Sequence, residues 1–244
     1  MSKKLAGKVA LVTGGSRGIS RAIAERLAQD DAMVIVNYGK SADKAKAVVA
    51  GIEAIGGKAV AIQADMSKVP DVRRLVGETV QRFGRLDILV NNAGMALLKP
   101  LVETTEHEFD EVFALNAKGS YFAMQEAAKV IEDGGRIVNI STAGTHMGFS
   151  GVTVYLGSKG ALEQFTKGLA HELAPKGVTV NTVSPGFTET EMLPDAFRET
   201  GAQMSPLKRV GTAQEIAEVV AFVVSDEARW LTGQNIHAGG GVVM

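Results

Sequence analysis

The stretch Lys8-Val-Ala-Leu-Val-Thr13-Gly14-Gly-Ser-Arg-Gly18-Ile-Ser20 decides the fold of this 244-residue chain. Its first part is a short apolar, β-branched run typical of a buried strand, and residues 21–29 follow as a helix. Glycines let a backbone approach a pyrophosphate, and a helix N-terminus offers free N–H groups and positive potential. A plain strand-to-helix turn also explains an isolated glycine cluster, and the spacing is Gly-x-x-x-Gly-x-Ser rather than Gly-x-Gly-x-x-Gly. The stretch indicates a dinucleotide site if the same alternation continues along the chain.

Strand and helix patterns do alternate to the end of the chain, with short connections. Expected strands cover residues 8–13, 32–37, 58–63, 86–90, 134–141, 178–183 and 234–237. Expected helices cover residues 21–29, 42–55, 69–83, 106–127 (bent near Asn116), 155–174 and 213–225. This alternation predicts a parallel, doubly wound α/β sheet in a single domain spanning residues 1–244. Residues 187–209 have weak periodicity and two prolines, so a mobile flap over the site is expected there, without an ordered core element.

Composition excludes several other classes of protein. The formal net charge is −1 without a long basic run, so nothing favours nucleic acid as a partner. The chain has no cysteine, and its four histidines are scattered, so neither a disulfide nor a metal site is expected. It has neither a signal-peptide pattern nor an apolar run of the ~20 residues that span a bilayer. A cytoplasmic protein with no membrane partner is therefore expected.

Tyr155-Leu-Gly-Ser-Lys159 places a phenol and an ammonium one helical turn apart on the same face. A phenol titrates near ~10 and is a poor acid or base at neutral pH. A nearby ammonium is expected to lower the pKa of Tyr155, which would make it a usable proton donor and acceptor. Because this spacing also occurs in amphipathic surface helices, its meaning depends on the other motifs.

The end of the second expected strand bears on the choice of dinucleotide. A carboxylate at this point binds the adenosine ribose of NAD, whereas this chain has amide, hydroxyl and cationic groups. They are Asn37, Tyr38, Lys40 and Ser41, together with Arg17 from the glycine turn. Such groups suit the 2′-phosphate of NADP(H), which is therefore expected ahead of NAD(H).

Five motifs occur in order along nearly all of the chain. They are Thr13-Gly-Gly-Ser-Arg-Gly18-Ile, Asn91-Asn-Ala-Gly94, Asn116, Tyr155-x-x-x-Lys159, and Pro185-Gly186 with Thr188 and Thr190. Together they resemble the classical short-chain dehydrogenase/reductase family, and most of all its 3-oxoacyl-(acyl-carrier-protein) reductase branch, with glucose-dehydrogenase-like members nearby. The resemblance implies a Rossmann-type, three-layer α/β/α domain with seven parallel strands, usually in a homotetramer. It also implies hydride transfer between a nicotinamide and a carbonyl or alcohol carbon.

The resemblance assigns roles to individual residues. In the reductive direction Tyr155 protonates the developing alkoxide, Lys159 holds the nicotinamide ribose hydroxyls, and Asn116 holds a water that links Lys159 to solvent. Thr188 contacts the nicotinamide amide. Asp65 contacts the adenine amino group or caps the segment after it, two roles that are compatible. The other expected cofactor residues are Gly14, Ser16, Arg17, Gly18, Ile19, Asn37, Tyr38, Met66, Asn91, Ala93, Gly94, Pro185 and Gly186.

Two positions depart from the family pattern. Ser20 replaces the third glycine of the turn, where a serine hydroxyl can bond locally at a modest packing cost. The catalytic serine of the family falls at Thr142, which keeps the hydroxyl but adds a methyl group. Ser141 is one residue early and points to the opposite face of a regular strand, so it takes the role only if a bulge re-aims it. Thr142 is expected to orient the substrate oxygen.

The residues that would meet the substrate are mostly apolar. Four of them belong to the flap: Met192, Leu193, Phe197 and Met204. These side chains could accept an acyl chain or a small hydrophobic ketone. Alternatively, they pack against a neighbouring helix or subunit. The loop 144–154 is expected to line the pocket, with His146 as a wall residue. An acidic carrier protein would need basic residues at the entrance; Glu132-Asp133 is acidic, although cations lie nearby. Those cations are Lys129, Arg136 and Lys176.

Three functions are compatible with these motifs. The favoured one is NADPH-dependent reduction of a small-molecule carbonyl or acyl thioester. The second is oxidation of a sugar or secondary alcohol with NAD(P), which uses the same residues in reverse. The third is a non-catalytic NADPH-binding protein, which has no physical need to keep Tyr155, Lys159 and Asn116 together.

Overall fold

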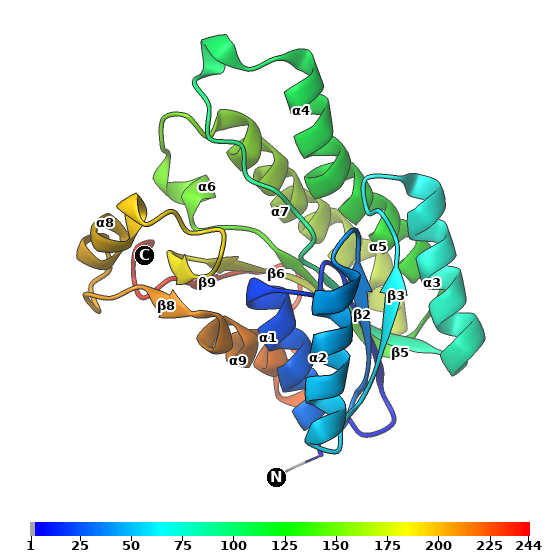
Figure 1. The fold of residues 1–244 in the computed structure, drawn as a ribbon. Helices are drawn as coiled ribbons and strands as arrows, with labels where there is room; N and C mark the ends of the chain where they lie inside the picture. The colour runs from blue at the N-terminus through cyan, green and yellow to red at the C-terminus, as the bar shows by residue number, and fades with distance from the viewer. Residues whose placement is uncertain (1–2) are drawn as a thin grey trace.

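Seven strands form one parallel sheet in the order β3-β2-β1-β4-β5-β6-β9 (Figure 1). The computed structural model describes residues 3–244. The strands are β1 Val9–Val12, β2 Met33–Tyr38, β3 Lys58–Gln63, β4 Leu86–Asn91, β5 Ile131–Ile140, β6 Thr179–Pro185 and β9 Asn235–Ala238. The direction of winding reverses between β1 and β4, which opens a crevice at their carboxyl ends. The predicted Rossmann-type doubly wound sheet is confirmed, and most strand bounds agree within one or two residues.

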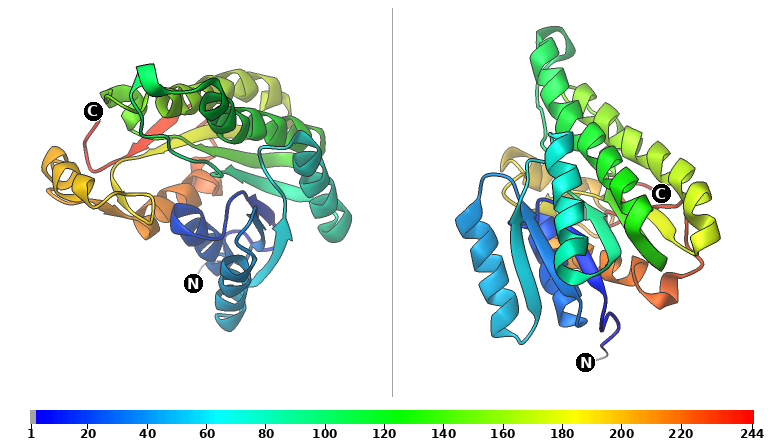
Figure 2. Two further views of the ribbon diagram at one scale, coloured as in Figure 1. Left: turned by 45° about the horizontal axis from the view of Figure 1, so that its top comes forward. Right: turned by 90° about the vertical axis from the view of Figure 1, so that its right-hand side faces the viewer.

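Helices cover both faces of this sheet, giving three layers (Figure 2). On one face lie α1 Gly18–Gln29, α2 Ala42–Ala54 and α9 Ala213–Val223. On the other face lie α3 Val69–Phe83, α5 Ser120–Val130 and α7 Thr153–Leu173. Each face has its own buried apolar cluster, and alternate residues of β1 enter the two clusters. A strand buried on both sides is apolar at every position, which is why the run 9–12 is recognisable in the sequence.

Helix ends follow local signals in the sequence. Pro70 lies in the first turn of α3, and Gly84 ends that helix with a φ of +76°, a left-handed conformation that favours glycine. At the start of α9, Thr212 and Glu215 form a reciprocal capping box. These signals set the lengths of helices whose positions the sheet then fixes.

The long helical pattern expected over residues 106–127 is divided in the structure. Helix α4 Glu106–Phe113 continues into a π-helical turn, η2 Ala114–Gly119, and then into α5. The π-helical turn falls at Asn116, the position where a bend is predicted. Gly119 approaches the carbonyl of Met66 so closely that any side chain there would overlap it. A π-turn adds one residue to a helical turn and often marks a functional position.

The flap segment 187–209 contains more regular structure than its sequence indicates. Helix α8 Ala196–Met204 lies within it, and β7 Thr188–Glu189 pairs in parallel with β8 Gly211–Thr212. These elements are regular, but none of their residues belongs to the buried apolar clusters of the sheet, which agrees with the expectation that the segment has no ordered core element. Helix α8 is short, and within it only Gly201 is buried, against the ring of Phe187, so its sequence shows little periodicity. The mobility of the segment stays a prediction.

Within residues 3–244, no helix is both long and apolar enough to cross a membrane.

Candidate active site

The glycine turn joins β1 to α1 at the crevice in the sheet. Gly14 and Gly18 have φ values of +66° and +54°, which a side chain would strain. A Cβ added to Gly14 would lie 3.0 Å from Ala93 Cα. The side chain of the N-cap residue Arg17 makes no capping bond, and the first turn of α1 contains no acidic residue. The N–H groups of this turn, around Ser16, Gly18 and Ile19, can therefore face an anion.

Ser20 replaces a glycine of the family pattern at little cost. Its side chain is buried, and its hydroxyl lies 2.6 Å from the carbonyl oxygen of Gly14 and 3.0 Å from that of Arg17. The local bond expected for this serine is present, and it ties the two ends of the glycine turn together.

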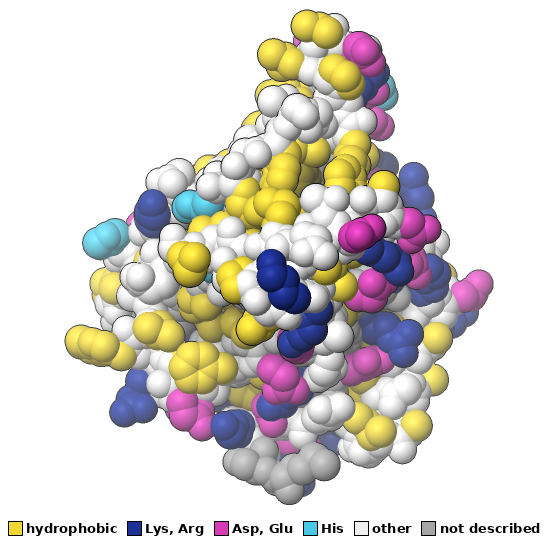
Figure 3. Space-filling model, turned by 90° about the vertical axis from the view of Figure 1, so that its left-hand side faces the viewer, with side chains coloured by type: hydrophobic (Ala, Val, Ile, Leu, Met, Phe, Trp, Pro, Cys, Tyr) yellow, Lys and Arg dark blue, Asp and Glu magenta, His cyan; other side chains and the backbone are white. Residues whose placement is uncertain are grey.

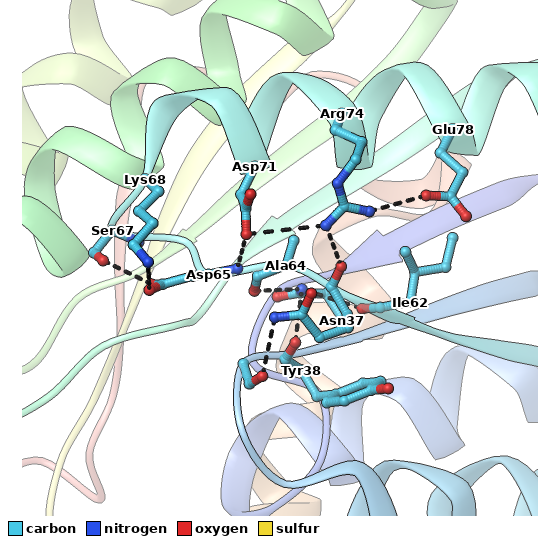
Figure 4. A network of polar contacts seen from close by, with 12 residues as sticks. Asn37, Tyr38, Ile62, Ala64, Asp65, Ser67, Lys68, Asp71, Arg74 and Glu78 are labelled. Carbon is cyan, nitrogen blue, oxygen red and sulfur yellow. Dashed lines mark hydrogen bonds and ion pairs between the residues drawn. The ribbon is translucent and has the colours of Figure 1, made fainter.

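Asn37 does not reach the cofactor groove with its side chain, contrary to the sequence-based prediction. The residue is only 1% exposed. Its amide Nδ2 donates to the carbonyls of Ile62 and Ala64 at 3.3 and 3.2 Å, and its Oδ1 accepts from Gly14 N at 3.1 Å (Figure 4). Asn37 thus links the ends of β2 and β3 to the glycine turn. It shapes the turn from behind and leaves no polar atom for a ribose.

Tyr38, Met66 and Asp65 also have structural contacts. The Tyr38 ring packs against the apolar cluster beneath α1 and α2, and Met66 is buried against α3 and β4. Asp65 Oδ1 accepts from the hydroxyl and the backbone N–H of Ser67 at 2.7 and 3.0 Å (Figure 4). The bond from the Ser67 hydroxyl is the main reason that the pKa of Asp65 is lowered. Asp65 therefore closes a local turn with Ser67, whereas helix α3 has Lys68 as its N-cap residue and no side-chain capping bond.

The loop after β4 divides its side chains between the interior and the crevice. Asn91 is buried and donates to Asn139 Oδ1 at 2.9 Å. Its side chain therefore does not line the cofactor groove, although the sequence predicts that it does. Gly94 lies in the crevice, where an added Cβ would sit 3.1 Å from Asn116 Oδ1 and 3.3 Å from Lys159 Nζ. The small residue therefore brings the loop directly against two predicted catalytic groups.

Asn116 connects the π-turn to two other elements. Its Oδ1 accepts from Met95 N at 2.8 Å, while Nδ2 lies 2.9 Å from both the Met95 carbonyl and Ser158 Oγ. Asn116 is fully buried. The amide thereby fixes the segment after Gly94 against α7, which carries Tyr155.

Thr142, rather than Ser141, occupies the position expected for the catalytic serine. The Thr142 hydroxyl lies close enough to Tyr155 to lower the pKa of its phenol, and its Oγ1 accepts from Gly144 N at 3.2 Å. Ser141 Oγ points the other way and donates to Glu163 Oε1 at 2.7 Å. No bulge re-aims Ser141, so the two hydroxyls lie on opposite sides of the chain, as the alternation of a strand requires.

Tyr155 has a raised pKa, which corrects the prediction from its spacing to Lys159. Burial raises the pKa of Tyr155 above its usual value because it removes water from around the phenolate, and the nearby Thr142 hydroxyl opposes this only in part. Tyr155 is therefore a neutral phenol, the form that donates a proton.

Lys159 is buried, with 4% exposure, and its Nζ donates to the carbonyl of Ile140 at 2.8 Å. Burial lowers the pKa of Lys159 from 10.5 to about 8. The ammonium is held at the carboxyl end of β5, one turn from Tyr155 on α7. A group with this pKa exchanges protons near neutral pH, which suits a proton relay.

These groups meet at one edge of the sheet, and known proteins share the fold that carries them. Residues 14–243 match the family described as enoyl-(acyl carrier protein) reductase. A crystal structure of a short chain dehydrogenase from Burkholderia cenocepacia in complex with NADP is 44% identical, covers 98% of this chain and 99% of its own, and superimposes with a TM-score of 0.96. The chain belongs to the short-chain dehydrogenase/reductase family.

Two further relatives of this dehydrogenase/reductase have informative names. The hydroxynaphthalene reductase arp2 of Aspergillus fumigatus is 45% identical over 94% of this chain and 90% of its own. The angucycline C-6 ketoreductase LanV, crystallised with bound NADP, is 42% identical, covers 99% of this chain and 98% of its own, and superimposes with a TM-score of 0.94.

The residues of this dehydrogenase/reductase fit a nicotinamide dinucleotide. The strained glycine turn and the uncapped N-terminus of α1 form an anion cradle at one end of the crevice. At the other end, Gly94 keeps the space beside Lys159 clear of a side chain. Pro185 and Gly186 end β6 at the same edge, and Thr188, which is buried, donates to the Gly186 carbonyl at 3.0 Å.

The flap of this dehydrogenase/reductase reaches across to the glycine turn. A Cβ on Gly18 would lie 3.6 Å from Thr190 Cγ2. The next residue, Glu191, pairs with Lys44 Nζ at 2.9 Å and with an Arg17 nitrogen at 3.7 Å. Exposed acid and base pairs of this kind are individually weak. They place the flap above the predicted phosphate site.

Sequence reasoning missed two residues that assemble this site. Thr13 Oγ1 accepts from the backbone N–H groups of Asn92 and Ala93 at 3.0 and 3.1 Å and so holds the loop after β4. Ser158 is fully buried, bonds Asn116 and donates to the Tyr155 carbonyl at 2.7 Å. Each residue carries a hydroxyl beside a recognised motif. The sequence shows that the hydroxyl is there, but it does not show which group the hydroxyl bonds.

Proposed function

We propose that this short-chain dehydrogenase/reductase is an NADPH-dependent ketoreductase. The observation that carries the proposal is the pairing of a neutral Tyr155 phenol with the Thr142 hydroxyl beside a buried Lys159. A carbonyl oxygen that gains negative charge needs a proton donor and a second hydrogen-bond donor, and this pair supplies both.

Each residue has a defined part in the proposed reaction. A bound nicotinamide supplies the hydride. Thr142 donates a hydrogen bond to the substrate oxygen, since the bond from Gly144 N already occupies one of its acceptor positions. Tyr155 gives its proton to the same oxygen. Lys159 favours the resulting phenolate and holds ribose hydroxyls, and Asn116 holds a water through which Lys159 regains a proton.

NADP(H) is the dinucleotide that we infer. Both solved relatives named above contain NADP. In this chain Arg17 lies at the N-terminus of α1 with an exposed guanidinium, and Lys40 is exposed just after β2. No carboxylate occupies the end of β2, because Asn37 is buried there and Tyr38 follows it. We assign recognition of the 2′-phosphate to Arg17 and Lys40 instead of Asn37.

The substrate that we favour is a free ketone or a 3-oxoacyl thioester. Carrier-protein docking has less support, because the basic residues suggested for it lie away from the site. Lys129 and Lys176 flank the amino end of β5, whereas Thr142 follows its carboxyl end. Arg136 is buried and contacts the carbonyl of Gly135.

A cyclic or aromatic ketone is the second candidate substrate, since relatives are named as a hydroxynaphthalene reductase and an angucycline ketoreductase. Apolar side chains are exposed on the face of the molecule in Figure 3. Large apolar side chains that are exposed in the loop 144–154 or in the flap are Phe149, Met192, Phe197 and Met204. The exposed flap side chains, Met192, Phe197 and Met204, are available to contact a substrate.

The test is oxidation of NADPH and NADH by the purified protein with acetoacetyl thioester, small diketones and a bicyclic aromatic ketone. Turnover of any of these compounds with NADPH supports the proposed reaction. The ratio of turnover with the thioester and the small diketones to turnover with the bicyclic ketone decides between the two candidate substrates. Oxidation of secondary alcohols or sugars without reduction of any ketone would replace the proposal with the dehydrogenase alternative. NADPH binding without turnover in either direction would indicate a non-catalytic protein.

We further propose a homotetramer, which the family resemblance implies. Large apolar side chains that a monomer would leave in water support it: Trp230 is 96% exposed and Phe222 is 50% exposed. Light scattering should give about four times the chain mass of 25.6 kDa.

A further inference from the structure

Glu163 is a buried carboxylate to which the reaction proposed above gives no role. It lies on α7 one turn after Lys159 and is 8% exposed. Burying a carboxylate costs free energy unless several donors compensate for the lost water. Its partners therefore indicate what the residue does.

All the polar partners of Glu163 within hydrogen-bond or ion-pair distance come from the segment that follows β5. Ser141 Oγ and Thr145 Oγ1 both donate to Oε1, at 2.7 and 2.6 Å. His146 Nε2 lies 3.3 Å from Oε2. One carboxylate thus joins helix α7 to both ends of a short turn that contains Thr142.

Thr142 lies between these anchored residues and faces the other way. Its own hydroxyl accepts from Gly144 N and lies on the side of Tyr155, whose pKa it lowers. The Ser141 hydroxyl also approaches the Lys159 carbonyl at 3.3 Å. Tyr155, Lys159 and Glu163 belong to one rigid helix, so fixing the turn to Glu163 fixes the Thr142 hydroxyl relative to the Tyr155 phenol.

We propose that Glu163 is a positioning residue, which holds the turn 141–146 against α7 and thereby sets the place of the Thr142 hydroxyl relative to Tyr155 on the same helix. The inference rests on the roles proposed for Tyr155 and Thr142. Small displacements of catalytic groups have large kinetic effects, on the order of 10²-fold for 1 Å. Loss of Glu163 should therefore lower kcat while the cofactor site, which it does not touch, stays intact.

The test compares Glu163→Ala, Glu163→Gln and the control Glu172→Ala, which removes an exposed carboxylate from the same helix. We expect Glu163→Ala to lower kcat by roughly 30-fold or more, with the Kd of NADPH within about twofold of wild type. Glu163→Gln should recover kcat to within about threefold of wild type, because its amide oxygen still accepts from both hydroxyls. Glu172→Ala should leave kcat unchanged.

Two outcomes would overturn the inference. One is an unchanged kcat in Glu163→Ala. The other is a loss of kcat matched by an equal loss of NADPH affinity and by a Gln variant as poor as Ala, since a general structural role predicts that pattern.

Two companion variants keep the test decisive if Glu163→Ala does not fold. Ser141→Ala and Thr145→Val each remove one donor to Oε1, and each should lower kcat without changing NADPH affinity. No loss of kcat in either variant contradicts the inference. Tyr155→Phe, assayed in parallel, distinguishes a failure of the proposed function from a failure of the Glu163 role. If Tyr155→Phe stays active, the proposed catalytic roles are wrong. If Tyr155→Phe is inactive while the Glu163, Ser141 and Thr145 variants keep wild-type kcat, only the role of Glu163 is wrong.

Discussion

Asn116 Nδ2 donates to Ser158 Oγ across 2.9 Å, in a part of the molecule where neither side chain meets bulk water. The bond joins the π-turn η2 to the helix that carries Tyr155 and Lys159. Ser158 passes the contact on, because its hydroxyl donates to the Tyr155 carbonyl. The π-turn, the loop after β4 and helix α7 are therefore one connected polar unit beneath the site.

Replacing Asn116 with alanine should weaken both stability and catalysis. The variant loses the bonds to Met95 and Ser158 and leaves buried backbone groups unpaired, which costs about 2 kcal/mol in the free energy of unfolding. Urea unfolding and kcat measure the two effects. Asn116→Asp is the matched comparison, since it keeps the acceptor for Met95 N but loses both donated bonds. Wild-type stability in Asn116→Ala would contradict the importance of this network.

The depressed pKa of Lys159 predicts a stability that increases with pH. The native pKa of about 8 lies below the unfolded value of 10.5, so the native state binds fewer protons between these values. Stability therefore rises as the pH increases through that window, by about 1 kcal/mol between about pH 7 and about pH 9. The rise should be absent from the pH profile of Lys159→Met, which has no ammonium to bury, and should therefore appear in the difference between the two profiles. A wild type and a Met variant with parallel pH profiles would show that Lys159 titrates normally.

Asn37→Asp should destabilise the protein, and not only shift its dinucleotide preference from NADPH toward NADH. A carboxylate at this position places negative oxygens against the carbonyls of Ile62 and Ala64, and it cannot donate to either. We expect a loss of about 3 kcal/mol, typical of breaking one side of a buried charged or polar pair. Thermal unfolding measures it. A stable variant with reversed dinucleotide preference would restore the role in ribose recognition that the sequence pattern indicates.

Arg17→Gln should lower the ratio of kcat/KM with NADPH to kcat/KM with NADH by about tenfold, the effect of losing one charge-assisted phosphate contact. The control is Arg21→Gln, another exposed arginine on α1, which pairs with Glu25. It should leave the ratio within about twofold, because its guanidinium already faces a carboxylate on the same helix. Equal effects of the two substitutions would mean that only the general positive charge of this surface matters.

Much of the fold is readable in the sequence because the sheet is buried on both faces. Each central strand is then an apolar run, and short connections leave only one way to wind the chain. The catalytic helix is readable for a similar reason, since Tyr155 and Lys159 recur at the period of a helix. Helix α8 is not readable, because most of its residues are exposed and impose no pattern.

The site is readable in its residue types but not in the orientation of its side chains. Asn37 and Asn91 end two strands beside the crevice, and the sequence suggests that both face the cofactor. Each points inward because carbonyls or amides of a neighbouring strand lie within reach, a fact set by register between distant segments. The pKa of Tyr155 depends in the same way on burial, which no local spacing encodes.

The most direct measurement is ketone-dependent oxidation of NADPH by wild type and by Tyr155→Phe, with the Kd of NADPH determined for both by fluorescence titration. We predict turnover by the wild type, less than about a tenth of that kcat in the variant, and nearly equal Kd values, because the phenol acts on the substrate oxygen and not on the dinucleotide. Residual activity above about a tenth of wild type, at unchanged NADPH affinity, would contradict the role of Tyr155 as the proton donor.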